Sequence, residues 1–125
     1  IYRGRLLPGA ARGTTTAASF VTGFHNSLTL LTAEVEGRSF GGGVLELVPS
    51  EISRLLLPLG EFPRADLDRL DALCRGAAGE EPEDLVAETD RIVARGTPGL
   101  SPELLVRLGA AAEHLRGLRF ARNST

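Results

Sequence analysis

Apolar residues in the first half of the chain recur at helical spacing in one stretch: Phe24, Leu28, Leu31 and Val35. Separations of four, three and four residues place such side chains on one face of an α-helix. Asn26 or Ser27 can cap its start, because either side chain can accept a hydrogen bond from a backbone N–H of the first turn. Gly37 suits its end. The β-branched residues in the same stretch would also suit a strand, but the spacing favours the helix.

The preceding residues 1–23 carry no such period. They are rich in Gly, Ala, Thr and Arg, a composition that predicts mostly loop, with one short extended piece at residues 18–22. Arg3, Arg5 and Arg12 come before any acidic residue, so this is the most basic stretch of the chain.

A run of three glycines at 41–43 follows the predicted helix. Each glycine inside a helix costs about 1 kcal/mol relative to alanine, so the run indicates a loop. Residues 44–48 are short and aliphatic, which predicts a strand. Pro49 ends that strand and can open a short helix over residues 50–57. Residues 1–58 are therefore expected to form a helix–glycine loop–strand unit.

The rest of the chain has a different pattern. Residues 59–63 form a predicted linker, and three segments with helical periodicity follow: about 65–75, about 82–95, and a long one that begins at Ser101. Ser101 suits the N-cap of the last helix, because Pro and Glu follow it in the first turn. The predicted fold class is α+β and mostly α-helical, with a three-helix tail over residues 64–125.

The charge balance excludes one class of protein. The 125 residues contain 14 basic and 16 acidic side chains, a net charge of −2, and every basic one is Arg. A histone-like polycation is excluded, but nucleic-acid binding is not, because local patches decide it. The start at Ile1, without Met, fits either a processed chain or a piece of a longer protein, and we expect the piece. No apolar run approaches the roughly 20 residues of a membrane span. With no signal peptide apparent, we expect a cytoplasmic location and no membrane partner.

The residues offer little for catalysis or metal binding. Cys74 has no histidine near it in the sequence and falls on the apolar face of a predicted helix, so we expect it to be buried. His25 and His114 lack the spacing of metal ligands. The glycine run follows a helix and precedes a strand, the reverse of a nucleotide-binding loop. It can either form a plain turn or lie against a nucleic-acid backbone, with Arg38 and Ser39 beside it.

One continuous stretch resembles a known family. The segment Gly-Arg-Ser-Phe-Gly-Gly-Gly-Val-Leu-Glu-Leu-Val-Pro at residues 37–49, together with Phe-His-Asn-Ser-Leu at 24–28, is similar to the C-terminal, post-catalytic region of bacterial N6-adenine DNA methyltransferases of restriction–modification systems. Phe40 stands where that family usually has Tyr. The resemblance covers about residues 20–60 well and the remainder loosely.

The resemblance implies a role next to catalysis. Such enzymes transfer a methyl group from S-adenosylmethionine to adenine in double-stranded DNA, using an Asn/Asp-Pro-Pro-Tyr/Phe motif that this chain lacks. We therefore expect no catalytic, cofactor-binding or metal-binding residue here, no activity of the chain alone, and a catalytic methyltransferase domain as partner on the same or another chain. The expected DNA contacts are Asn26, Arg38, Ser39, Gly41, Gly42 and Gly43.

The sequence leaves three alternatives open. Asn26 could read a base edge, or it could only cap its helix. Arg38 could contact DNA, or it could pair with Glu34 one helical turn before it. The chain as a whole could instead be a small helical protein-interaction module with no nucleic-acid role, which the net acidic helical half favours.

Overall fold

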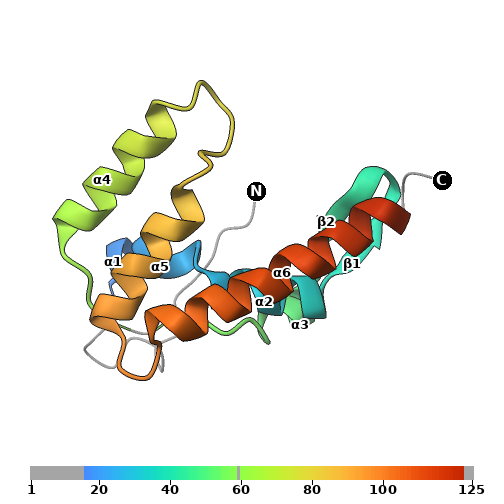
Figure 1. Ribbon diagram of the computed structural model, residues 1–125, viewed down its shortest axis with the longest axis horizontal. Helices are drawn as coiled ribbons and strands as arrows, with labels where there is room; N and C mark the ends of the chain where they lie inside the picture. The colour runs from blue at the N-terminus through green and yellow to red at the C-terminus, as the bar shows by residue number, and fades with distance from the viewer. Residues whose placement is uncertain (1–15, 59, 123–125) are drawn as a thin grey trace.

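The computed structural model describes residues 16–58 and 60–122. Within these ranges the chain forms one antiparallel hairpin and six α-helices (Figure 1): α1 (Ala17–Phe24), α2 (Ser27–Glu36), α3 (Pro49–Ile52), α4 (Arg64–Arg75), α5 (Leu85–Gly96) and α6 (Pro102–Arg122). The fold is α+β and mostly helical with a three-helix tail, as predicted. The basic residues Arg3, Arg5 and Arg12 lie outside the described ranges.

Helix α1 corrects the prediction of an extended piece at residues 18–22. Thr16 caps the helix, and its hydroxyl oxygen accepts the Ser19 N–H at 3.1 Å. The buried side of α1 consists of Ser19, Thr22 and Gly23. Because these residues are small or polar, the buried face leaves no period in the hydropathy of the sequence.

Helix α2 forms where it is predicted, but it buries a different face. Asn26 caps it by accepting the Thr29 N–H at 3.0 Å. The buried residues are Ser27 and Thr29, whereas Val35 of the predicted apolar stripe is 64% exposed. Phe24 belongs to α1, so the expected stripe spans two helices and does not form one continuous face.

The glycine run forms the turn of a hairpin. Strands β1 (Arg38–Phe40) and β2 (Val44–Glu46) flank a 3₁₀ turn at Gly41–Gly43, so part of the predicted strand at 44–48 is confirmed and β1 is new. The antiparallel register pairs Arg38 with Glu46, Ser39 with Leu45 and Phe40 with Val44. Three residues that begin with Arg and Ser carry too little hydropathy pattern to predict a strand.

The short helix after Pro49 ends sooner than predicted. Helix α3 stops at Ile52, while the prediction extends it over residues 50–57. The backbone of Leu56 is bound to α2 instead: its carbonyl accepts the Thr29 hydroxyl at 2.8 Å, and its N–H is donated to the Thr32 hydroxyl at 3.2 Å. These tertiary hydrogen bonds hold the segment in a non-helical form.

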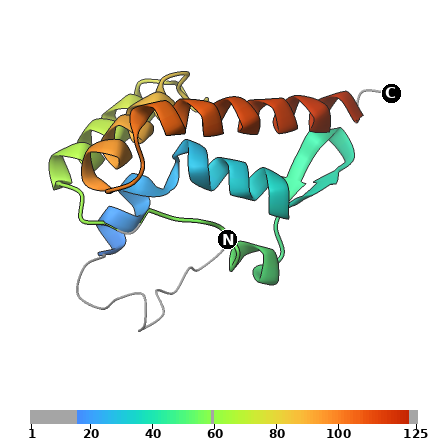
Figure 2. The same ribbon diagram turned by 60° about the horizontal axis from the view of Figure 1, so that its bottom comes forward.

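Helices α4 and α5, which carry much of the hydrophobic core, lie at the opposite end of the molecule from the hairpin (Figure 2). The buried core consists of Phe62, Leu70, Ile92, Val93 and Leu105. It joins α4, α5 and the start of α6, whereas the hairpin lies beside the last turns of α6 (Figures 1 and 2). Helices α2 and α6 run side by side between the two ends. The hairpin is therefore held by a few specific contacts with α2 and α6 and not by the core.

Candidate nucleic-acid interface

The two polar residues of β1 lie on opposite faces of the hairpin. Side chains alternate along a strand, so Arg38 and Phe40 share the outer face, and Ser39 shares the inner face with its partner Leu45. Ser39 lines a cavity of about 60 Å³ together with residues of α2 and α6, among them Arg122. Sequence proximity suggests that Arg38 and Ser39 act together, but the pleat separates them.

Arg38 pairs with Glu51 and not with Glu34. Its Nε lies 2.8 Å from Glu51 Oε1, and its side chain remains 63% exposed. The alternative pair with Glu34 is wrong, because α2 ends at Glu36 and the chain is extended at Arg38, which removes the one-turn relationship.

The Glu51 carboxylate accepts hydrogen bonds both from the start of α3 and from the hairpin. Its second oxygen accepts the Val48 N–H at 2.9 Å. This backbone hydrogen bond, followed by that from Arg38, lowers the pKa of the Glu51 carboxyl below its ordinary value. Arg38 is thus anchored at one nitrogen to a fixed, ionised group while most of its side chain faces solvent.

Arg119 of α6 connects α2 to the glycine turn. Its Nη2 lies 2.7 Å from Glu34 Oε1 and its Nε lies 3.1 Å from Glu34 Oε2, with both side chains only 10% exposed. Hydrogen bonding to Glu34 raises the pKa of the Arg119 guanidinium. The same guanidinium donates to the backbone carbonyl of Gly43. The ion pair therefore fixes one end of the turn from two helices.

The three glycines have different surroundings. A Cβ built on Gly43 would lie 2.6 Å from the ring of Phe120, so this residue packs directly on α6. Gly42 and Gly43 have φ angles of +79° and +78°, in the region that favours glycine. No atom lies within 4 Å of a Cβ built on Gly41 or Gly42. The turn is seated on α6 at Gly43 and open to solvent at Gly41 and Gly42.

Asn26 lies in the interior of the fold. Its side chain is fully buried, its Nδ2 donates to the Gly23 carbonyl and the Thr29 hydroxyl at 2.7 Å each, and its Oδ1 accepts the Thr29 N–H. The side chain is a helix cap, one of its two expected roles. Asn26 is therefore not part of the interface that we propose below.

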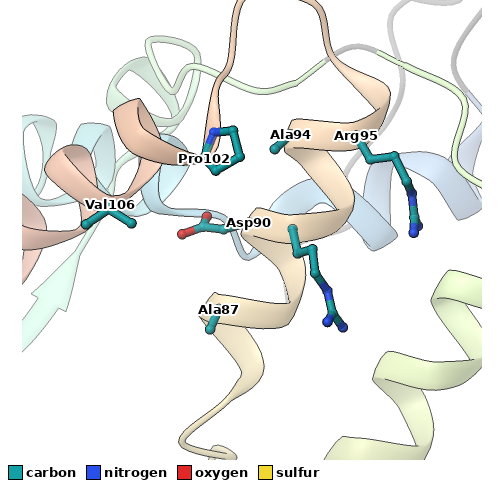
Figure 3. Close-up of a pocket in the computed structure, with 7 residues that line it drawn as sticks. Ala87, Asp90, Ala94, Arg95, Pro102 and Val106 are labelled. Atoms are coloured by element: carbon teal, nitrogen blue, oxygen red, sulfur yellow. The ribbon is translucent and has the colours of Figure 1, made fainter.

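An apolar groove of about 560 Å³ lies between α5 and the start of α6 (Figure 3). Its walls include Ala87, Ala94, Pro102 and Val106. The Asp90 carboxylate, which also lines the groove (Figure 3), accepts the N–H and the hydroxyl of Ser27, at 2.7 and 2.6 Å. Burial raises the pKa of the Asp90 carboxyl. The groove offers apolar surface, and its acidic residue is bound to Ser27 at the start of α2.

Other candidate chemistry is sparse. Cys74 is exposed, which corrects the expectation of burial: α4 uses Leu70 as its buried residue, and the neighbouring turn of the helix stays open to solvent. Within residues 16–58 and 60–122, no three His, Cys, Asp or Glu side chains are grouped as metal ligands. In the same ranges, none of the helices combines the length and hydropathy that crossing a bilayer requires.

Comparison with known proteins gives the family. Residues 1–94 match the family model of the C-terminal domain of the type II methyltransferase M.Eco57I. The match covers 94 of the 125 residues. The chain therefore belongs to this family of type II methyltransferase C-terminal domains, which confirms the methyltransferase resemblance. No curated protein and no solved structure matches the chain. Helix α6, with Arg119 and Phe120, lies beyond the matched residues.

Proposed function

We propose that this chain is the C-terminal, DNA-engaging and structural part of a site-specific adenine-N6 DNA methyltransferase that uses S-adenosylmethionine. Membership in the type II methyltransferase family supports the enzyme context. The resemblance of residues 24–28 and 37–49 to adenine-specific enzymes supports the choice of base and methyl donor. The partners are double-stranded DNA and the catalytic domain, on the same or another chain. The chain contributes no catalytic residue itself.

The observation that carries the proposal is an exposed arginine beside an open glycine turn. Arg38 is 63% exposed although its Nε is bound to Glu51. A planar guanidinium can donate to a phosphate oxygen as a fork, and the bond to Glu51 restricts where it can lie. Arg38 is the residue that we assign to the phosphate backbone.

The glycine turn supports a close approach of DNA. Gly41 and Gly42 have no side chain and no neighbouring atom where one would be. Backbone N–H groups at such a turn can donate to phosphate oxygens without steric interference. Ser39 lies on the inner face beside Arg122, opposite Arg38, and is not among the groups that we assign to this contact. These groups position a duplex and carry no base information by themselves.

The balance of charge limits the strength of this contact. Glu46 lies across the hairpin from Arg38, and Glu51 pairs with it. Two carboxylates thus surround the arginine, so the hairpin is no broad basic surface. We assign one phosphate contact to Arg38, further backbone contacts to the glycine turn, and the remaining affinity to the catalytic domain.

The test compares two arginines in the full-length methyltransferase. Arg38→Ala should lower the affinity for cognate and scrambled duplexes alike and reduce the slope of log affinity against log salt by about one unit. Arg64→Ala is the matched control, because Arg64 is an exposed arginine in α4 with a carboxylate partner, Asp68, at 3.2 Å. Unchanged binding of Arg38→Ala on both duplexes at every salt concentration removes Arg38 from the interface.

The same titration separates this function from a protein-interaction module. Phosphate contacts give steep salt dependence because counterions are released from DNA. A module without a nucleic-acid role leaves the DNA affinity of the enzyme independent of every substitution in the hairpin.

A further inference from the structure

The end of the hairpin is apolar and exposed. Residues 39–45 contain no charged side chain. Phe40 and Val44 form the last cross-strand pair before the turn and are 52% and 60% exposed. We call Phe40, Val44 and the turn at Gly41–Gly43 the apolar tip. Contiguous apolar residues on a surface, unlike single ones, are candidates for a contact with another molecule.

The apolar tip is held in one position by α6. Arg119 binds the Gly43 carbonyl, and the ring of Phe120 lies where a side chain on Gly43 would be. The guanidinium carbons of Arg116 and Arg119 lie 5.4 and 4.9 Å from the centre of the same ring. A contact surface fixed before binding loses little conformational entropy when its partner arrives.

Phe40 shares its face with the arginine assigned to the DNA backbone. Arg38 and Phe40 are two residues apart on one strand, a separation of roughly 7 Å. Two base steps along one strand of a duplex span a similar length, at about 3.4 Å each. With β1 running along one DNA strand, an arginine on a phosphate places Phe40 about two nucleotides further along that strand.

We propose that Phe40 stacks on an unstacked base of the bound DNA, with Val44 as a second apolar contact, while Arg38 holds the backbone. This inference rests on the proposed function, since methylation of adenine requires the target base to leave the duplex stack. Removal of one base exposes the faces of its neighbours. An aromatic side chain on a narrow, uncharged tip suits such a face.

The experiment uses the full-length methyltransferase and duplexes with 2-aminopurine at the target adenine or next to it. Phe40→Ala should weaken binding of the target duplex by about 5- to 150-fold, and Phe40→Leu should weaken it as well, because leucine keeps apolar volume but cannot stack. Phe40→Trp and Phe40→Tyr should bind within about twofold of wild type. The salt slope should stay unchanged, since no phosphate contact is lost.

Phe24→Leu in α1 is the matched control, because it removes an exposed phenylalanine remote from the hairpin. Binding of the wild-type enzyme should change the fluorescence of 2-aminopurine in the duplex. This change should persist in Phe24→Leu and should be smaller in Phe40→Leu. Phe40→Leu could have the DNA affinity and the fluorescence change of wild type while Arg38→Ala still reduces the salt slope. In that case the stacking of Phe40 is wrong and the proposed function stands. If Phe40→Leu instead separates the chain from its catalytic domain, the apolar tip is a protein interface. If hairpin substitutions leave DNA binding unchanged at every salt concentration, the proposed function fails as well.

Discussion

Arg119 and Glu34 form a two-point ion pair between α6 and α2, 85 residues apart in the chain and nearly shielded from water. The pair matters because Arg119 also holds the carbonyl of Gly43. Helix α6 lies beyond the residues that match the family, yet it supplies this support for the turn. The position of the hairpin therefore depends on the last helix of the chain.

Removal of either partner of this pair should destabilise the fold. Glu34→Ala or Arg119→Ala leaves a nearly buried charge without its partner, and each should lower the free energy of unfolding by about 3 kcal/mol. The double variant should lose less free energy of unfolding than the two single variants together, because it leaves neither charge unpaired. Urea unfolding of the four proteins measures this, and strictly additive losses contradict it. Arg64→Ala, which breaks an exposed pair, should change stability by less than about 1 kcal/mol.

The glycines of the turn should respond to alanine in a fixed order. Gly41→Ala should change stability by less than about 0.5 kcal/mol, because open space surrounds it. Gly42→Ala should cost about 1–2 kcal/mol for its positive φ. Gly43→Ala should cost more, since the new methyl group also meets Phe120.

A further substitution isolates the contact with the ring. Phe120→Ala should recover part of the loss in Gly43→Ala by removing the obstructing atoms, as measured by the same urea unfolding. An equal effect of alanine at all three glycines would mean that the turn is not seated on α6.

The N-cap of α6 gives a local prediction. Ser101 Oγ accepts the Leu104 N–H at 3.1 Å, which confirms the cap expected from the sequence. Ser101→Ala should lower the free energy of unfolding by about 1 kcal/mol. Ser101→Asp keeps an acceptor at the cap and should remain close to wild type in thermal unfolding. A loss in the aspartate variant as large as in the alanine variant contradicts the capping role.

Much of the scaffold can be predicted from sequence, and the reasons for each failure are physical. Helices α4, α5 and α6 follow from apolar spacing, although α5 begins at Leu85 and not near residue 82, and the glycine run predicts a turn. Helix α1 is not predicted, because its buried residues Ser19 and Thr22 are polar and leave no helical period in the hydropathy. The candidate site can also be predicted in part, because three consecutive glycines next to Arg38 are an unusual composition.

The partners of the site residues are not predictable in the same way. Arg119 and Gly43 are 76 residues apart, and no local pattern encodes a contact between a helix and a distant turn. Arg38 pairs with Glu51 because a strand, not a helix, begins there. Tertiary geometry decides both contacts.

Stability should depend on the ionisation of Glu51. The Val48 N–H and Arg38 lower the pKa of its carboxyl from the usual 4.5. A folded-state pKa below the unfolded one stabilises the fold above the unfolded value, and this contribution is lost as the pH falls through the folded value. The advantage of wild type over Glu51→Gln in urea unfolding should therefore be full near neutral pH and shrink below about pH 4.5. A constant difference over the whole range contradicts this ionisation effect.

The central claim, that DNA lies against the glycine turn, is tested most directly by cross-linking to duplex DNA that carries a tethered disulfide on its backbone. The chain has one cysteine, Cys74, which is exposed on α4 and serves as the reference position in the wild-type chain. In the Cys74→Ser background, Gly41→Cys adds a thiol at an open position of the turn. We predict that this thiol forms the protein–DNA adduct faster than Cys74 does in the wild-type chain, and that the advantage disappears at high salt. Equal rates at the two positions at low salt would contradict the account.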